Sequence, residues 1–389
     1  MERPLFSRLR AFAAATGRSG GRLFFASGRV NLLGAHIDYH GGCVLPVAID
    51  RGIALLARPR ADRRLTVASA DFPGRYDFAL DALPPAGDAG FAAYPAGVAQ
   101  LLREAGRELP GCDLTIAGDL PPGAGMSSSA ALLVATAMAL STLSGAPLEP
   151  LEAARLAFRA ETGYVGVRCG IMDPFASALG RAGHALWLDC KEERFDYVPL
   201  PADRLAFVML DSMTRRDLKS GAFNQRVAES KAALATLQRH LPAITCLRDV
   251  TVEQLDALRG ELEPQPFQRA RHVVTEVARV RRARELLLRG ELLEFGQLMW
   301  LSHLSSRHLY EVSTPRLDAL HEIALGHPGC YGARLTGAGF GGCALAVVHP
   351  RVVESFCAHV VAAFEQRFGQ RPEIHPLAFG QAPGEVIER

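Results

Sequence analysis

The sequence predicts an α+β fold in two lobes. Its 389 residues exceed what one hydrophobic core usually supports, because single cores stop growing near about 250–300 residues. Strand-like and helical stretches are interleaved without the regular repeat of a doubly wound sheet. A new series of strands begins near residues 190–200. We therefore expect two domains, residues 1–197 and residues 198–389.

The first domain is expected to begin with a helix and to continue mainly as strands. Residues 4–16 have the apolar spacing of an amphipathic helix, and short apolar runs follow that are typical of strands. These strands are expected at 23–27, 43–49, 52–59 and 64–70. A Pro/Gly-rich loop at 82–90 separates them from a helix at 94–106. A second helix, 127–145, has serines at its start and glycine at its end.

The second domain is expected to begin with strands and to continue mainly as helices. The apolar runs HALWLDC and LAFVMLDS predict strands at 184–190 and 205–212. Helical periodicity follows at 221–240, 264–289, 291–304 and 314–326. The glycine-rich stretch 333–349 predicts a hairpin, and a last helix and strand complete the chain.

Charge and cysteine content exclude several classes of protein. The formal net charge is +2, from 43 basic and 41 acidic residues, which gives no basis for binding nucleic acid or an anionic membrane. No apolar run reaches the roughly 18 residues of a membrane span. The eight cysteines lack the spacing of zinc ligands and are typical of reduced thiols in a cytoplasmic protein.

The stretch PPGAGMSSSAALLVA, residues 121–135, has the composition of a phosphate-binding loop. Glycines let the backbone approach a ligand, and the first turn of a helix presents unpaired N–H groups and the positive end of its dipole. Serine hydroxyls can donate to phosphate or ligate Mg²⁺. The candidate contacts are Gly123, Gly125, Ser127, Ser128 and Ser129. A serine-capped helix after a turn would give the same pattern.

Two further glycine-rich stretches carry candidate chemistry. In ETGYVGVRCGIMDPFASALG, Glu161 and Asp173 are carboxylates in a stretch broken by glycines. Asp173 could accept a proton from a substrate hydroxyl or orient it, although a helix cap is the simpler role. In LTGAGFGGCALAVV, residues 335–348, four glycines suit a tight turn and also let a ligand lie against bare backbone.

Taken together and in this order, the motifs resemble those of the galactokinase branch of the GHMP small-molecule kinases. GRVNLLGAHIDYHGG, residues 28–42, resembles that branch's sugar signature GRVNLIGEHxDYxGG. PPGAGMSSSAA resembles its phosphate loop, CGIMDPFAS its CGIMDQxAS segment, and GARLTGAGFGGC its third motif. The resemblance extends from about residue 22 to about residue 350, and it implies a GHMP kinase fold whose active site lies in the cleft between the lobes.

The resemblance implies transfer of the γ-phosphoryl group of ATP to the anomeric hydroxyl of a hexose. By matching position, Asp173 is the catalytic aspartate, and Arg29 keeps it ionised and helps to neutralise the transferring group. His36, Asp38 and Gly170 match residues that hold sugar hydroxyls. Ser129 and Glu161 match ligands of Mg²⁺, and residues 123–129 match the phosphate cradle. Phosphoryl transfer depends mainly on positioning and charge neutralisation, which such residues provide.

Two departures from the signature bear on the sugar. Ala35 replaces the usual glutamate, which contacts the 6-hydroxyl of galactose in galactokinases, and Phe223 replaces a tyrosine that faces the sugar. Alanine removes the repulsion that a glutamate would exert on a carboxylated sugar. GAHID also resembles the corresponding stretch of plant galacturonokinases. We expect D-galacturonate as the substrate, with galactose, L-arabinose and glucuronate as alternatives.

A carboxylated sugar would need a cation nearby. Arg168 is one candidate, and Arg215, Arg216 and His40 are others, although in an arginine-rich chain each is more often a solvated surface charge. The remaining expected partners are the sugar and ATP alone, with no nucleic acid or membrane, and the chain is expected to be a monomer or weak dimer. A non-catalytic sugar sensor is the alternative from another class, although the presence of Arg29, Glu161 and Asp173 favours an enzyme.

Overall fold

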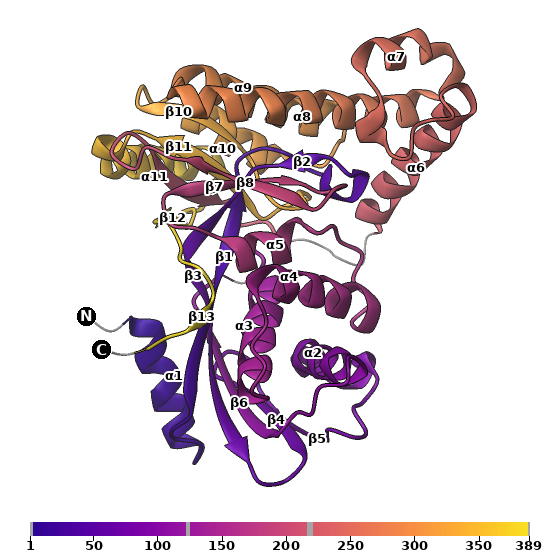
Figure 1. The fold of residues 1–389 in the computed structure, drawn as a ribbon. Coiled ribbons are helices and arrows are strands. Elements are labelled where there is room, and N and C mark those ends of the chain that lie inside the picture. Colours follow the sequence, from indigo (N-terminus) through magenta and orange to yellow (C-terminus); the bar gives the residue numbers. More distant parts are fainter. Residues whose placement is uncertain (1–2, 122–124, 216–220, 388–389) are drawn as a thin grey trace.

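The computed structural model describes residues 3–121, 125–215 and 221–387. It confirms the predicted α+β fold, in which two lobes are built around separate sheets (Figure 1). Within these described ranges, no helix is long and apolar enough to cross a bilayer. Buried apolar side chains form one large cluster that runs from the first lobe into the second.

The first lobe contains a six-stranded sheet in the order β13-β1-β3-β6-β4-β5. The pairing is antiparallel except between β4 and β6. Its strands are β1 (Arg22–Asn31), β3 (Pro46–Arg60), β4 (Arg64–Ser69), β5 (Arg75–Ala79), β6 (Gly111–Gly118) and β13 (Gly384–Glu385).

Helices cover both faces of this sheet. On one face, α1 buries Leu5, Phe6 and Leu9 against β3 and β6. On the other face, α3 packs on β1 and β3, with α2, α4 and α5 around it (Figure 1). The bounds are α1 (Pro4–Ala15), α2 (Ala93–Glu104), α3 (Ser128–Leu143), α4 (Pro150–Arg159) and α5 (Met172–Leu179). Helix α3 is apolar on all sides because it is enclosed by sheet and helices.

The second lobe combines a four-stranded antiparallel sheet, in the order β10-β11-β9-β12, with six helices. Its strands are β9 (Ala206–Asp211), β10 (Cys330–Leu335), β11 (Cys343–Val348) and β12 (Ile374–Leu377). Its helices are α6 (Ala222–His240), α7 (Val252–Ala257), α8 (Pro264–Arg289), α9 (Leu292–His308), α10 (Pro315–Leu325) and α11 (Val353–Phe368). Helices α9 and α10 pack on β10.

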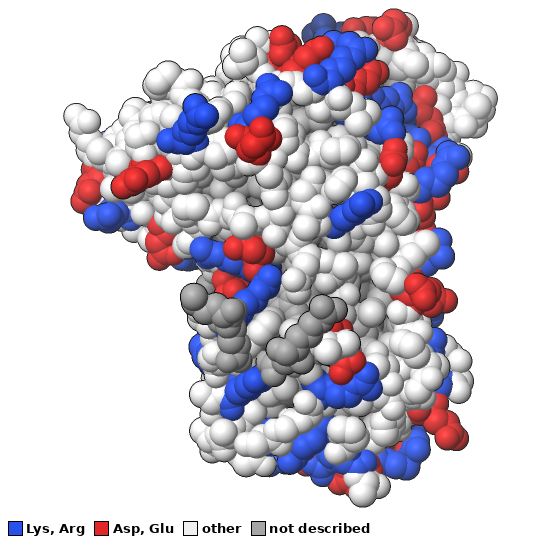
Figure 2. Space-filling model, turned by 60° about the vertical axis from the view of Figure 1, so that its left-hand side comes forward, with Lys and Arg blue, Asp and Glu red and all other residues white. Residues whose placement is uncertain are grey.

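A small sheet of β2 (Cys43–Val44), β7 (His184–Asp189) and β8 (Arg194–Pro199) contacts both β3 and α8, and so joins the lobes. The predicted domain boundary between residues 197 and 198 falls within β8 and stays a prediction. On the face in Figure 2, basic and acidic side chains lie beside one another, in keeping with the small net charge.

One strand differs from the sequence prediction. The expected strands 43–49 and 52–59 are β2 and a continuous β3, which runs through the polar pair Asp50–Arg51. The C-terminal segment supplies partners for this pair, because the Asp50 N–H donates to the carbonyl of Ala378 and Arg51 lies 3.4 Å from His375. A polar pair therefore does not end the strand here.

Candidate active site

A cavity of about 630 Å³ brings together segments that are far apart in the sequence. Its walls come from the end of β1 and the loop after it, from residues 166–173, from the start of α6 and from the glycine-rich turn after β10. The cavity includes Arg29, Ala35, Asp38, Gly170 and Asp173. His36, Arg168 and Phe223 also line it.

Arg29 and Asp173 form an ion pair in this cavity. Arg29 is on β1 and Asp173 is in the first turn of α5. Nε and Nη2 of Arg29 each lie 2.8 Å from a different carboxylate oxygen of Asp173. This two-point contact is the strongest geometry available to an arginine and a carboxylate, and it fixes the orientation of both groups. Arg29 is 4% exposed, so the guanidinium cannot move freely.

Arg29 also ties the aspartate to the segment before α3. Its Nη1 donates to the carbonyl of Gly125 at 2.5 Å, and its backbone N–H donates to that of Met126 at 3.1 Å. This approach requires glycine at position 28, since a Cβ there would lie 2.7 Å from the Met126 carbonyl oxygen. The Ser127 hydroxyl donates to Asp173 at 2.5 Å.

The start of α3 has the features of an anion site. Ser127 is in the left-handed region at φ 60°, so the chain turns sharply into the helix at Ser128. The first N–H groups of α3 and its dipole then point toward the segment that precedes it. Gly125 is also left-handed, at φ 74°. Gly123, predicted as a phosphate contact, lies outside the described residues.

The side-chain oxygens of Ser129 and Glu161 lie together beside this helix end and could hold a metal ion. The Ser129 hydroxyl donates to Glu161 Oε1 at 2.7 Å. Glu161 lies in the π-helical turn Ala160–Tyr164 and is 4% exposed, and burial raises the pKa of its carboxyl group. Hydroxyl and carboxylate oxygens suit Mg²⁺, which proteins usually hold with one or two such ligands together with substrate phosphates. Among the described residues, no group of three or more His, Cys, Asp or Glu side chains is placed to hold a metal ion.

Asp38 faces Gly170 across the cavity wall. A Cβ at position 170 would lie 2.0 Å from Oδ2 of Asp38, so only glycine leaves room for this carboxylate. Burial, together with the nearby charge of Asp173, raises the pKa of Asp38 to about 6. Among the described residues that line the cavity, the two carboxylates are Asp38 and Asp173, and Asp173 is the one paired with Arg29.

His36 is held by protein partners at both ring nitrogens. Its Nε2 lies 3.1 Å from the carbonyl oxygen of Ala338, which can only accept, so Nε2 carries the proton. Its Nδ1 then accepts from the Tyr39 hydroxyl at 2.8 Å. Burial lowers the pKa of His36 to about 3 and keeps the ring neutral. His36 thus links the sugar signature in the first lobe to the glycine-rich turn of the second.

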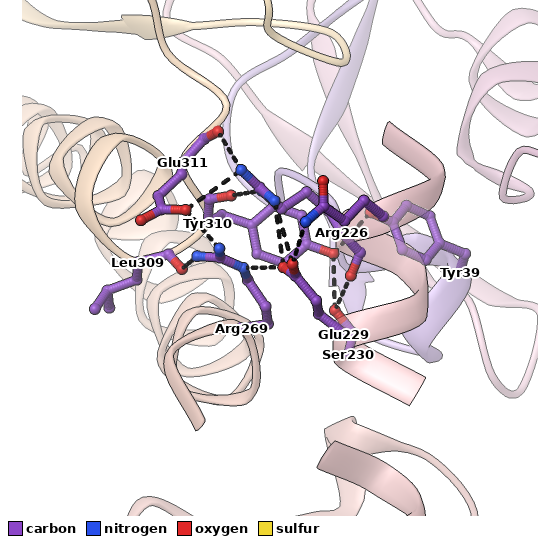
Figure 3. Close-up of polar contacts among 9 residues, drawn as sticks. Tyr39, Arg226, Glu229, Ser230, Arg269, Leu309, Tyr310 and Glu311 are labelled. Carbon is purple, nitrogen blue, oxygen red and sulfur yellow. Dashed lines mark hydrogen bonds and ion pairs between the residues drawn. The ribbon is translucent and has the colours of Figure 1, made fainter. Parts of the chain in front are cut away.

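A polar network around Tyr39 and Tyr310 is drawn in Figure 3, and the rings of both tyrosines contact the ring of His36. The Tyr39 hydroxyl contacts the Tyr310 hydroxyl at 3.0 Å, and Tyr310 contacts Ser230 at 3.1 Å. Arg269, buried on α8, pairs with Glu229 of α6 and with Glu311, and it also donates to the carbonyl of Leu309. This network holds α6 against α8, and α6 carries Phe223 in its first turn.

Ala35 is fixed through its backbone. Its N–H and that of Gly34 donate to Glu276 Oε1 at 3.2 Å and 2.9 Å, and its carbonyl accepts from His272 Nε2 at 2.9 Å. Burial alone would raise the pKa of Glu276, but Arg279 and Arg334 outweigh it and hold the pKa well below its usual range. A buried, ionised carboxylate on α8 therefore holds the loop that carries Gly34 and Ala35.

The predicted cations differ in where the structure places them. Arg168 lines the cavity and is exposed. Arg215 forms an ion pair with Asp211 at 2.9 Å and does not line the cavity. His40 is buried, its pKa is lowered by burial to about 3, and it too is absent from the cavity lining. Arg216 lies outside the described residues.

Sequence reasoning missed Arg334, a buried arginine in the cavity wall. It also missed Asn31 and Asn224, which line the same cavity. The signal for Arg334 was a single charge in the apolar strand ARL before the glycine-rich turn. Glu276 was missed because α8 is rich in charged residues, and its sequence does not distinguish the buried Glu276 from the exposed Glu285.

Three family models match the chain. The galactokinase galactose-binding signature matches residues 10–59, the N-terminal domain of GHMP kinases matches 93–181, and the C-terminal domain matches 283–366. A protein named galactokinase from a Roseiflexus species is 44% identical over 93% of this chain and 92% of its own length. One from Exiguobacterium sibiricum is 38% identical over 96% of each chain.

Solved structures agree with these matches. The Lactococcus lactis galactokinase complexed with galactose superimposes with a TM-score of 0.92 at 33% identity, over 98% of this chain and all of its own. A mevalonate kinase superimposes with a TM-score of 0.66 at 18% identity, over 92% of this chain and 99% of its own, which shows a common fold.

Proposed function

The chain belongs to the galactokinase family of GHMP kinases, and from that premise we propose that it phosphorylates the anomeric hydroxyl of D-galacturonate. It is a sugar kinase that uses ATP. The position of the hydroxyl that is phosphorylated and the identity of the sugar are the parts that we propose. The observation that carries the choice of sugar is Ala35 in the cavity wall, where the family signature has glutamate.

The paired residues account for the chemistry. The Asp173 carboxylate accepts the proton of the attacking hydroxyl, or orients that hydroxyl, while Arg29 holds the carboxylate in place. Arg29 also brings positive charge next to Gly125, where the phosphate segment begins its turn into α3. Ser129 and Glu161 would hold Mg²⁺, which supplies charge neutralisation for the phosphates of ATP.

The sugar pocket supports a carboxylated substrate on electrostatic grounds. Two like charges about 4 Å apart repel by about 4 kcal/mol at an effective dielectric constant of about 20, which is roughly a thousandfold in an equilibrium constant. A glutamate at position 35 would impose such a repulsion on a carboxylate at carbon 6. Ala35 removes that charge and leaves the space open.

Galactose is the second candidate. The galactose-binding signature matches the segment that contains Ala35, and relatives as similar as 44% identity are named galactokinase. The two candidates share the ring hydroxyls that Asp38 would bind and differ only at carbon 6. L-Arabinose has the same ring without carbon 6 and serves as the neutral reference, and glucuronate tests the configuration at carbon 4.

The test is a coupled assay of ADP release with galacturonate, galactose, L-arabinose and glucuronate. We expect galacturonate to give the highest kcat/KM, and Ala35→Glu to lower that value by about 100-fold or more relative to L-arabinose. Ala35→Gln is the matched control, because it adds the same bulk without the charge. A wild-type preference for galactose by tenfold or more would contradict galacturonate as the substrate.

The catalytic assignment has its own test. Asp173→Asn keeps the shape of the side chain but removes the carboxylate, so we expect no turnover of any sugar while ATP still binds. Substantial turnover by this variant would contradict the role of Asp173.

A further inference from the structure

Arg334 is a charged residue buried in the wall of the sugar cavity. It lies in β10, is 1% exposed, and lines the same cavity as Ala35 and Asp38. Burying a guanidinium is costly unless an anion or a full set of hydrogen-bond acceptors compensates it. Its partners therefore indicate whether the protein alone satisfies it.

The hydrogen bonds of Arg334 compensate it only in part. Its Nη1 donates to the carbonyls of Asn31 and Leu32, both at 3.3 Å. These are neutral acceptors at the long end of the usual range. Its Nε is buried and has no hydrogen-bond partner among the residues that the structure describes.

The carboxylate whose charge acts on Arg334, that of Glu276, already accepts hydrogen bonds from other groups. Glu276 accepts from Arg279 at 2.6 Å, from the Ser302 hydroxyl at 2.6 Å, and from the backbone N–H groups of Gly34 and Ala35. No hydrogen bond joins it to Arg334 within the described part of the chain. Burial lowers the pKa of Arg334, while the charge of Glu276 opposes this effect.

We propose that Arg334 is the residue that recognises an anionic group at carbon 6 of the sugar. This proposal rests on the proposed function, and it assigns the cation that a carboxylated sugar requires. Arg334 contacts the carbonyls of residues three and four positions before Ala35, so its guanidinium lies beside the loop that carries the alanine. Because residue 35 is alanine, no carboxylate at that position competes with the sugar for Arg334.

A second polar atom on the same wall points to a ligand. Asn31 lines the cavity. Its side-chain oxygen is buried and has no hydrogen-bond partner among the described residues. An amide oxygen can only accept hydrogen bonds, so it needs a donor such as a sugar hydroxyl. A donor at Arg334 and an acceptor at Asn31 match a ligand that presents both a carboxylate and hydroxyl groups.

The experiment compares Arg334→Gln with Arg351→Gln, since Arg351 is an exposed arginine that does not line the cavity. We expect Arg334→Gln to lower kcat/KM for galacturonate by about 100-fold or more, mainly through KM, and to change that for L-arabinose by less than about threefold. We expect Arg351→Gln to change both values of kcat/KM by less than about threefold. Equal losses for both sugars in Arg334→Gln would show a structural role and overturn the proposal.

Two measurements keep the outcome decisive. If Arg334→Gln does not fold, Arg334→Lys is measured in the same way, because it keeps the charge but loses the planar fork. A KM increase of about tenfold or more for galacturonate alone supports recognition by Arg334, and an unchanged KM, or one that rises equally for both sugars, overturns it.

The proposed function fails separately, through a wild-type preference for galactose. In that case galacturonate is tested as a competitive inhibitor, and an inhibition constant unaffected by the Arg334 variant overturns the proposal.

Discussion

Asp38→Asn is expected to stabilise the folded protein at neutral pH while weakening sugar binding. Burial and the charge of Asp173 raise the pKa of Asp38 from 3.8 to about 6. Between about pH 4 and pH 6, the folded protein therefore holds a proton that the unfolded chain has released. The free energy of unfolding falls as pH rises through this window, and above about pH 6 the folded protein bears the full cost of the charge.

The size of the effect follows from the shift. A difference of about two pKa units corresponds to about 3 kcal/mol at pH 8 and to about half of that at pH 5. Asparagine has nearly the same shape and does not titrate, so the variant does not carry this cost. We expect the stability of Asp38→Asn relative to the wild type to increase by about 1.5 kcal/mol between pH 5 and pH 8.

The assay is urea unfolding of both proteins at pH 5 and pH 8. Buried histidines also make stability depend on pH, because burial lowers their pKa values to about 3–4. They are present in both proteins, so the difference between the two isolates Asp38. The same variant should raise KM for the sugar by about 10- to 100-fold, the value of a hydrogen bond to a charged group. A stability difference that does not change with pH would refute the reasoning.

Three further predictions concern the residues around the cavity. Arg29→Lys should lower kcat by about 100-fold or more in steady-state assays, because one ammonium cannot hold both oxygens of Asp173 and the Gly125 carbonyl; a kcat within threefold of wild type would contradict this. Ser129→Ala should raise the Mg²⁺ concentration for half-maximal rate by about tenfold, and an unchanged titration would remove Ser129 from the metal site. Glu276→Leu should lower the free energy of unfolding by about 3–5 kcal/mol, measured in urea, because Arg279 and two N–H groups lose their partner; Glu276→Gln should lose less.

Most of the candidate site could be predicted because its residues lie in short motifs. Arg29 and Asp173 are 144 positions apart, yet both lie in segments whose glycines and polar residues stand out from their surroundings. The structure brings them together with Ser127, as the order of the motifs implied. Such motifs can be read from the sequence because a site of this kind depends on backbone shape, which glycines determine, as well as on side chains.

The supporting residues could not be predicted in the same way. Glu276 and Arg269 lie on α8, where charged residues are frequent and most of them face solvent. Whether such a charge is buried depends on how α8 packs against α6 and α9, which a single sequence does not state. The continuity of β3 likewise depends on contacts with residues 375–378, more than 300 positions away.

The final segment of the chain ties the two lobes together. Within a short span, β12 pairs with β9 in the second lobe and β13 pairs with β1 in the first. Asp50 contacts both Arg3, before α1, and Ala378, after β12, and the N and C ends of the chain lie close together in Figure 1. A short engineered linker could therefore join the two ends into a circular permutant. In that permutant the segment from β12 to β13 would lie inside the chain and would still pair with one strand in each lobe.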